Sequence, residues 1–250
     1  MKVSYGSAFY EEMESPNARS ARVVVPLVAS YLGLMPNRVV DIGCGRGLWL
    51  KAFLGQGATQ VDGYDGEYVE REKLAIPASC FHAANLEESI AFSAPYNLAV
   101  CLEVAEHLPA KAADTLIKTL TEAAPVVLFS AAIPLQGGSH HVNEQWPEYW
   151  EKKFAGRGYV PVDCLRRHMW SDDRISFFYQ QNMLMFVKER ELANYPKLLA
   201  ERENGHDKAL ALVHPHMYDY YAKRWHSIEP FLWKLPLPLV KWGKRILMCK

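Results

Sequence analysis

The stretch that decides the fold of this chain is Val39-Val40-Asp41-Ile42-Gly43-Cys44-Gly45-Arg46-Gly47. Two β-branched residues lead into an acid and then into glycines at alternate positions, and a helical pattern begins directly after them. A strand that ends in such a turn exposes bare backbone, which a Cβ at Gly43 or Gly45 would obstruct. Asp65 ends the next apolar run, where an acidic residue can hold a pair of ribose hydroxyls. Together these features predict a site for a nucleoside-containing cofactor.

The dinucleotide-binding fingerprint is absent from this turn, because it needs a glycine at the sixth position from Gly43 and the residue there is Leu48. What remains is Asp-x-Gly-x-Gly-x-Gly, which resembles motif I of the class I S-adenosylmethionine (SAM)-dependent methyltransferases. In that family the glycine loop passes under the methionine and ribose parts of SAM, and the leading acid orients the loop and the cofactor's ammonium. The resemblance implies that SAM is held by Asp41, Gly43, Gly45, Gly47 and Asp65. An ordinary glycine-rich turn of an α/β protein is the alternative.

The charge balance gives no reason to expect a nucleic-acid partner. Lys plus Arg and Asp plus Glu both number 28 among 250 residues, and no basic stripe lies beside the predicted site. The cysteines number 5 and never pair at metal-ligand spacing, so we expect neither a disulfide framework nor a zinc site. The N-terminus lacks the apolar core of a signal peptide, and no run of about 18 apolar residues is present. A cytoplasmic location is therefore expected.

Apolar runs and turn signals alternate along the chain as strands and helices do. We expect strands at 39–42, 59–65, 80–82, 97–102 and 126–129. Ser15-Pro16 is typical of a helix start, and helices are expected at 16–32, 48–56, 110–124 and 147–155. An antiparallel strand pair, with a turn at Asp172-Asp173, would complete the sheet at 160–163 and 175–187. The order predicts a Rossmann-like, doubly wound α/β fold, mostly parallel with an antiparallel final strand pair and with helices on both faces.

Two parts are expected in the chain. Residues 1–188 would form the methyltransferase domain, with an N-terminal lid segment around Tyr5 and Tyr10 and an acceptor-side insertion at 131–150. Residues 189–250 would form a helical extension with a basic, Trp-rich tail. Such a tail is typical of a segment that contacts an anionic membrane surface, and also of a helix that packs on the body or on the second subunit of a homodimer. Packing on protein is the preferred interpretation.

The third predicted strand is followed by Asn85-Leu86, which matches the family's Asp-Leu pair beside the adenine. The resemblance therefore implies that Asn85 and Leu86 also contact SAM, and an amide can both donate and accept hydrogen bonds at the adenine edge. Alternatively, Asn85 is the N-cap of a helix over 87–91, and the two roles are compatible.

The fourth predicted strand ends in Glu103-Val104-Ala105-Glu106-His107, which resembles the family's motif IV, so Glu103 is also expected at the methionine end of SAM. The Glu-x-x-Glu-His pattern resembles the metal-binding signature of the small-RNA 3′-terminal 2′-O-methyltransferases and of some ubiquinone-pathway O-methyltransferases. There, with a distant His, it holds a divalent ion that also binds the acceptor hydroxyls. The resemblance implies Mg²⁺ or a similar ion on Glu103, Glu106, His107 and His141. Metal-free relatives also carry Glu-His-Leu here, with a structural His, so both interpretations stay open.

A polar insertion follows the fifth predicted strand, on the edge where the acceptor should enter. Its run His141-Val142-Asn143-Glu144-Gln145-Trp146 resembles a bacterial group of class I methyltransferases in which His141 is the matching histidine. Further residues that fit this group are Arg166, Trp170 and 179–182. Without a metal, His107 or His141 would be the catalytic base. A solvated loop pair is the alternative for His140 and His141.

The expected activity is SAM-dependent transfer of a methyl group to a hydroxyl of a small-molecule or glycan-type acceptor, with or without a metal. An N-methyltransferase of a small metabolite is the alternative within enzymes. A SAM-binding partner protein without catalysis is the alternative outside them, although the polar, histidine-bearing insertion argues against it. The sequence does not identify the acceptor.

Overall fold

The computed structural model describes residues 7–205 and 209–232, with side chains at 16–205 and 209–223. These residues belong to two compact units, Met1–Leu212 and Val213–Lys250, and the second contains helix α8 (Pro215–Leu232). The first unit continues past the predicted boundary at residue 188. The Tyr5 lid, the Tyr10 side chain and the tail side chains from Trp225 onward lie outside the described residues. Within the described part of the chain, no helix is both long and apolar enough to cross a bilayer.

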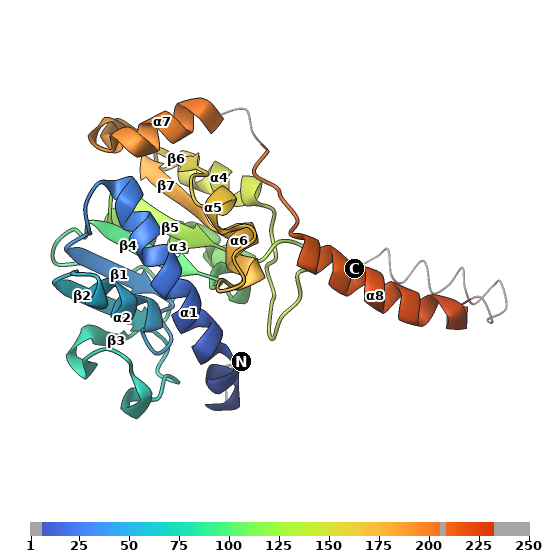
Figure 1. Ribbon diagram of the computed structural model, residues 1–250. Helices are drawn as coiled ribbons and strands as arrows, with labels where there is room; N and C mark the ends of the chain where they lie inside the picture. The colour runs from blue at the N-terminus through green and yellow to red at the C-terminus, as the bar shows by residue number, and fades with distance from the viewer. Residues whose placement is uncertain (1–6, 206–208, 233–250) are drawn as a thin grey trace. The chain divides into compact units, whose positions relative to one another are not determined.

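A mixed sheet forms the centre of the first unit (Figure 1). Its described strands are β1 (Arg38–Ile42), β2 (Gln60–Asp65), β3 (Phe81–Ala83), β4 (Leu98–Leu102), β5 (Val126–Ser130), β6 (Tyr159–Val162) and β7 (Leu184–Lys188). The strand order is β3-β2-β1-β4-β5-β7-β6. The pairs from β3 to β5 are parallel, whereas β7 runs antiparallel to both β5 and β6. The predicted Rossmann-like fold with an antiparallel final strand pair is therefore confirmed.

Helices cover both faces of the sheet. The α-helices of the first unit are α1 (Ser7–Leu32), α2 (Leu48–Gly55), α3 (Ala113–Ala123), α4 (Pro147–Ala155), α5 (Arg166–Met169), α6 (Phe177–Asn182) and α7 (Pro196–Gly205). Short 3₁₀ helices lie at η1 (Arg71–Lys73), η2 (Ala78–Cys80), η3 (Ala105–His107), η4 (Ala110–Ala112) and η5 (Glu189–Asn194). Helices α1 and α2 pack on one face, and α3 and α4 pack on the other. The sheet is thus buried on both sides, as parallel sheets usually are.

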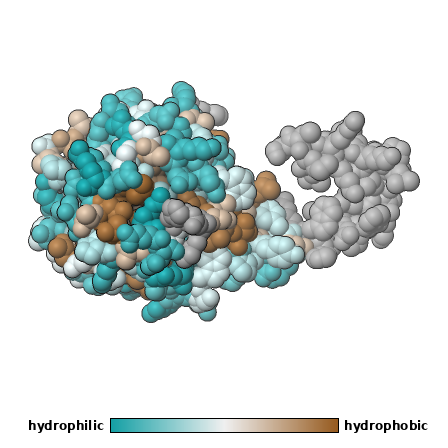
Figure 2. All heavy atoms as spheres, turned by 90° about the horizontal axis from the view of Figure 1, so that it is seen from above, coloured by the Kyte–Doolittle hydropathy of each residue, from teal (hydrophilic) through white to brown (hydrophobic). Residues whose placement is uncertain are grey.

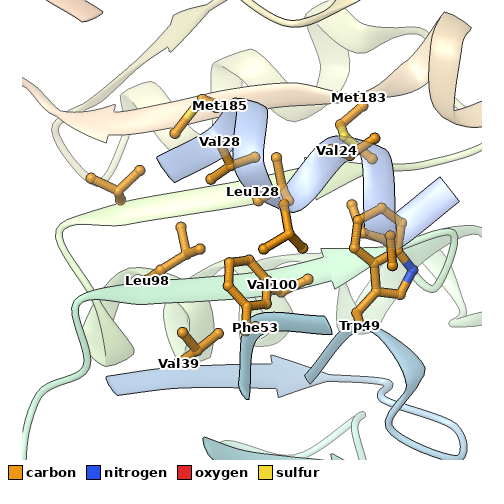
Figure 3. Packing of buried hydrophobic residues seen from close by; sticks show 14 of the residues in the cluster. Val24, Val28, Val39, Trp49, Phe53, Leu98, Val100, Leu128, Met183 and Met185 are labelled. Carbon is orange, nitrogen blue, oxygen red and sulfur yellow. The ribbon is translucent and has the colours of Figure 1, made fainter. Parts of the chain in front are cut away.

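Alternating side chains of each strand supply the two halves of the core. Val39 of β1 points to the α1 and α2 side, and its neighbour Val40 points to the α3 and α4 side. Figure 3 shows the first half, in which Val24 and Val28 of α1 pack over the strands. A fully buried Val or Leu contributes about 1.5–3 kcal/mol. The visible face of the larger unit in Figure 2 is mostly hydrophilic, with hydrophobic side chains gathered near its centre.

The predictions for the first helix and for the segment 175–187 need correction. Helix α1 begins at Ser7, so Pro16 lies inside the helix and does not start it. The predicted strand over 175–187 is also wrong in its first half, because α6 occupies Phe177–Asn182 and only β7 is extended. A strand would place polar side chains of this segment in the core without partners. In α6, by contrast, the Gln180 Nε2 donates to the carbonyls of Met169 and Asp172 at 2.7 and 2.9 Å. A turn does form at the predicted place, with the Ile175 N–H donating to the Asp172 carbonyl at 2.8 Å, but it leads from α5 to α6 and does not join two strands.

Candidate functional site

A cavity of about 500 Å³ lies at the carboxyl ends of β1, β2 and β4. Ligands of open α/β sheets bind at this edge, outside the strand ends. The lining residues that the sequence singles out are Asp41, Gly43, Gly45, Asp65, Leu86, Glu103, Glu106, His107 and His141. The cavity therefore joins the glycine turn, the segment after β4 and the polar insertion in one space.

The glycine turn after β1 depends on backbone angles that L-residues rarely adopt. Gly43, Gly45 and Gly47 have φ of 86°, 52° and 79°. A Cβ built on Gly43 would lie 2.3 Å from Cγ2 of Val104, and one on Gly47 would lie 2.9 Å from the side chain of Ile76. The bare backbone at Gly43 thus makes room for Val104 of the protein itself, in addition to any ligand.

The carboxylate of Asp65 ties β2 to this turn. Its Oδ2 accepts a hydrogen bond of 2.7 Å from the Gly45 N–H, and its Oδ1 accepts one of 2.7 Å from the Gly66 N–H. The Tyr68 hydroxyl also donates to Oδ1, a contact that the sequence did not suggest. Burial raises the pKa of Asp65, and burial together with the Asp65 charge raises the pKa of Asp41 well above its usual value. Asp41 and Asp65 are therefore two neighbouring, largely buried acids at the bottom of the cavity.

Leu86 lines the cavity, whereas Asn85 is exposed and does not. The Asn85 Oδ1 accepts from the Glu87 N–H at 3.2 Å, and its Nδ2 donates to the Glu88 carboxylate at 2.8 Å. These bonds close a turn, and the predicted helix over 87–91 does not form. The N-cap interpretation of Asn85 is therefore wrong, because an Asx turn satisfies the same backbone groups without a helix.

Glu103, directly after β4, is held in a strained conformation. Its φ is 54°, in the left-handed region that non-glycine residues avoid, and such strain is typical of functional sites. Its backbone N–H donates to the Ser130 carbonyl at 3.0 Å. Its carboxylate accepts hydrogen bonds from Asn182 Nδ2 at 3.0 Å and from Gln136 Nε2 at 2.9 Å. Burial raises the pKa of Glu103, and these amides oppose the shift. The Glu103 carboxylate therefore has hydrogen-bond partners within the protein and does not need a bound cation.

The predicted metal-ligating residues separate into two groups. One ligand atom from each of Glu106, His107 and His141 lies within 4.8 Å of the others, and Glu103 lies outside this set. Glu106 is fully buried, and neither of its carboxylate oxygens has a hydrogen-bond partner among the residues that the structure describes. Burial and the nearby Glu103 charge raise the pKa of Glu106 well above its usual value, and the nearby backbone N–H groups of Glu106 and Ala132 oppose this shift only in part. Burial and the neighbouring His141 lower the pKa of His107 to about 4, so its imidazole is neutral near pH 7.

The polar insertion is fixed to this cluster by its backbone. The N–H groups of Val142 and Asn143 donate to the Glu106 carbonyl at 2.8 and 3.0 Å. The rings of His107 and His141 lie 4.8 Å apart and nearly perpendicular. Glu144, to which the sequence assigned no role, accepts a 2.9 Å hydrogen bond from His141 Nδ1. His141 is therefore part of the site and not of a solvated loop pair, whereas His140 is exposed.

Some of the residues that fit the family resemblance have structural roles. Arg166 is buried, pairs with Asp163 at 2.7 Å, and donates to the carbonyls of Gln181 and Leu210 at 3.1 and 2.7 Å. Tyr179 does line the cavity, and its hydroxyl accepts from Trp49 Nε1 at 3.3 Å and donates to Asn17 Oδ1 at 3.2 Å. These bonds join α1, α2 and α6 at one wall of the cavity.

Comparison with known proteins agrees with this geometry. A family model described as a methyltransferase domain matches residues 17–173. No curated protein matches the chain. Among solved structures, DesVI of Streptomyces venezuelae has a TM-score of 0.55 and 12% identity, covering 72% of this chain and 95% of that one. Magnesium protoporphyrin IX methyltransferase of Synechocystis PCC 6803 with bound S-adenosylhomocysteine (SAH) has a TM-score of 0.52 and 19% identity over 75% and 90%. CalO1, a methyltransferase in calicheamicin biosynthesis in its SAH-bound form, has a TM-score of 0.51 and 14% identity over 72% and 56%. At these identities the likeness to solved structures is a likeness of fold.

Proposed function

The chain belongs to the methyltransferase-domain family, and from this premise we propose that it transfers a methyl group from SAM to a hydroxyl of a small-molecule or glycan-type acceptor. The observation that carries the proposal is the contact between Asp65 and the glycine turn on one wall of the cavity, with Glu106, His107 and His141 on another. A site for the donor and a site for the acceptor thus share one space.

The donor side fits SAM. Asp65 is a buried carboxylate at the end of β2, where ribose hydroxyls can donate to it. Asp41 and Glu103 line the same space, and their carboxyl oxygens can accept hydrogen bonds from the ammonium of SAM. Leu86 offers an apolar contact for the adenine. Two of the structural neighbours bind SAH in the same fold, which supports this assignment.

The acceptor side fits an oxygen nucleophile. In the transfer, the acceptor oxygen forms a bond to the methyl carbon while the bond from that carbon to the sulfonium breaks, and SAH leaves. The hydroxyl proton must go to a base, and in a site without a metal the His141 imidazole can accept it at Nε2 because Nδ1 is engaged by Glu144. The depressed pKa of His107 keeps that ring neutral, so it adds no positive charge that would oppose the approach of SAM.

A divalent transition-metal ion such as Fe²⁺ or Mn²⁺ fits the acceptor side as well, because two imidazoles and one carboxylate suit such an ion better than Mg²⁺. The Glu106 carboxyl group is the observation that supports it, because both its oxygens are buried without a hydrogen-bond partner in the described part of the chain, and a bound cation would let this acid ionise there. Glu106, His107 and His141 would hold the ion, and Glu103 would not, since amides already satisfy it. When bound, the ion would lower the pKa of the acceptor hydroxyl and fix its position.

Binding of SAH tests the donor assignment. Because SAH would bind the folded protein alone, it should raise the melting temperature and give a saturable signal in calorimetric titration. Absence of both effects at millimolar SAH would refute the proposal.

Turnover tests the acceptor assignment. The protein should form SAH from SAM in the presence of a panel of hydroxyl-bearing small molecules and sugars, and treatment with EDTA should abolish this turnover. Activity on amines alone would refute the hydroxyl acceptor and would show that the protein is an N-methyltransferase. Unchanged turnover after EDTA would remove the metal from the proposal and leave His141 as the base.

A further inference from the structure

Glu144 occupies an unusual position in the polar insertion, because it holds the loop and a site histidine at the same time. Its Oε2 accepts from the Leu135 N–H at 2.8 Å, and its Oε1 accepts from the Gly137 N–H at 2.8 Å. The same Oε1 lies 2.9 Å from Nδ1 of His141. Glu144 itself does not line the cavity, whereas His141 does.

These contacts determine which nitrogen of His141 carries the proton. Both oxygens of Glu144 already accept hydrogen bonds from backbone N–H groups, and a carboxylate offers acceptors only. The His141 Nδ1 must therefore be the donor, and Nε2 keeps its lone pair. A carboxylate on one ring nitrogen commonly orients the other nitrogen toward a metal or a reacting group.

The loop around the ring leaves space for this orientation. A Cβ built on Gly138 would lie 2.3 Å from His141 Nε2, and Gly138 has a φ of 154°. Gly138 and His141 both line the cavity, so Nε2 lies next to bare backbone at the cavity surface. Leu135 and His140 adopt left-handed φ values of 69° and 63°. The Glu144 bond to the Leu135 N–H stabilises the first of these strained positions.

We propose that Glu144 is a positioning residue that fixes His141 in the Nδ1–H tautomer and presents Nε2 to the acceptor side of the cavity. The inference rests on the proposed function, because it assigns a purpose to the free nitrogen of His141 in binding a metal or taking the acceptor proton. Glu144 acts through His141 and touches no reactant.

The tautomer can be measured without an acceptor. In long-range ¹H–¹⁵N spectra of the EDTA-treated full chain in alkaline buffer, the wild-type His141 signal, assigned by its loss in His141→Gln, should show a protonated Nδ1 and an unprotonated Nε2. In Glu144→Ala the Nε2–H form should become populated. Glu144→Gln keeps one oxygen acceptor and should restore most of the wild-type signal. Gln145→Ala is the matched loop control, because the Gln145 side chain bonds Asn143 and not His141, and it should leave the signal unchanged.

Mn²⁺ titration gives a second readout. Loss of the carboxylate behind a ligating histidine typically weakens metal binding by about 10–100-fold, so Glu144→Ala should bind Mn²⁺ weaker by that factor, and Gln145→Ala should bind as the wild type does. SAH affinity should be the same in the wild type, Glu144→Ala, Glu144→Gln and Gln145→Ala.

A wild-type His141 with its proton on Nε2, or a Glu144→Ala protein with the wild-type tautomer, would overturn the inference. If Glu144→Ala does not fold, the wild-type spectrum and Glu144→Gln decide. Failure of wild type to bind SAH would refute the proposed function instead, and the tautomer would still be readable.

Discussion

The Asp65 carboxylate and the Gly45 N–H are joined by a hydrogen bond of 2.7 Å, which links the end of β2 to the turn after β1. These two segments are adjacent because β1 and β2 pair in parallel, with Asp41 opposite Gly63 and Ile42 opposite Tyr64. The acid and the glycine turn therefore form one preorganised wall of the cavity. This wall is the basis for the first prediction.

Asp65→Ala should weaken SAH binding by about 10–100-fold, since a hydrogen bond to a charged group contributes about 1.5–3 kcal/mol. The matched control is Asp62→Ala on the same strand. Asp62 pairs with His82 and Tyr96 and does not line the cavity, so its loss should leave the SAH affinity unchanged. Calorimetric titration of the three proteins makes the comparison. Equal affinities for wild type and Asp65→Ala would contradict the assignment of the ribose site.

Gly43→Ala should lower the free energy of unfolding by about 2–4 kcal/mol. The new Cβ makes the left-handed φ of this residue unfavourable, and it also clashes with the Val104 side chain. Gly57→Ala is the control for the backbone term alone. Gly57 has a φ of 109° and open space around it, so we expect a loss of only about 1–2 kcal/mol. Adding Val104→Ala to Gly43→Ala should recover part of the loss in urea denaturation. Equal losses for the two glycine variants would show that Val104 is not the obstacle.

The fold could be predicted from the sequence because its signals are local. The apolar run into Asp41, the glycines after it and the alternation of later strands depend only on neighbouring residues. Helix α6 could not be predicted in this way. Its polar side chains are buried because distant groups satisfy them: Gln180 bonds to Met169, and Asn182 bonds to Glu103. Those partners are known only once the chain has folded.

The site could be predicted in part for the same reason. Glu106, His107 and His141 come together as the sequence indicates, because two of them share one turn and the insertion brings the third. Glu103 does not join them, since Gln136 and Asn182 occupy its carboxylate. Glu144 and Tyr68 were missed because their roles follow from loop conformations. The spacing of Glu144 three residues after His141 is the one signal that could have indicated the pair.

Tyr68→Phe should tighten SAH binding by about tenfold or more. The Tyr68 hydroxyl donates to Oδ1 of Asp65, so a ribose hydroxyl that binds this oxygen must first displace a hydrogen bond to a charged group, which is worth about 1.5–3 kcal/mol. Tyr96→Phe is the matched control, because its hydroxyl donates to Asp62 at 3.0 Å on the same strand and outside the cavity. Calorimetric titration with SAH distinguishes the two. Weaker binding in Tyr68→Phe would mean that the hydroxyl contacts the ligand instead of competing with it.

Glu106→Gln should abolish the stabilisation that a divalent ion gives to this protein. Mn²⁺ added after EDTA treatment should raise the melting temperature of the wild type, because it binds the folded state, and should leave that of Glu106→Gln unchanged. The variant should fold about as well as the metal-free wild type, since Gln is neutral and matches the shape of the protonated acid that burial favours at this position. Glu122→Gln is the control: Glu122 makes an exposed ion pair with Arg157 at 3.0 Å, and such pairs contribute little. An equal Mn²⁺-dependent rise in Glu106→Gln and wild type would refute a metal site at Glu106, because the buried carboxylate is the one charged ligand of the set.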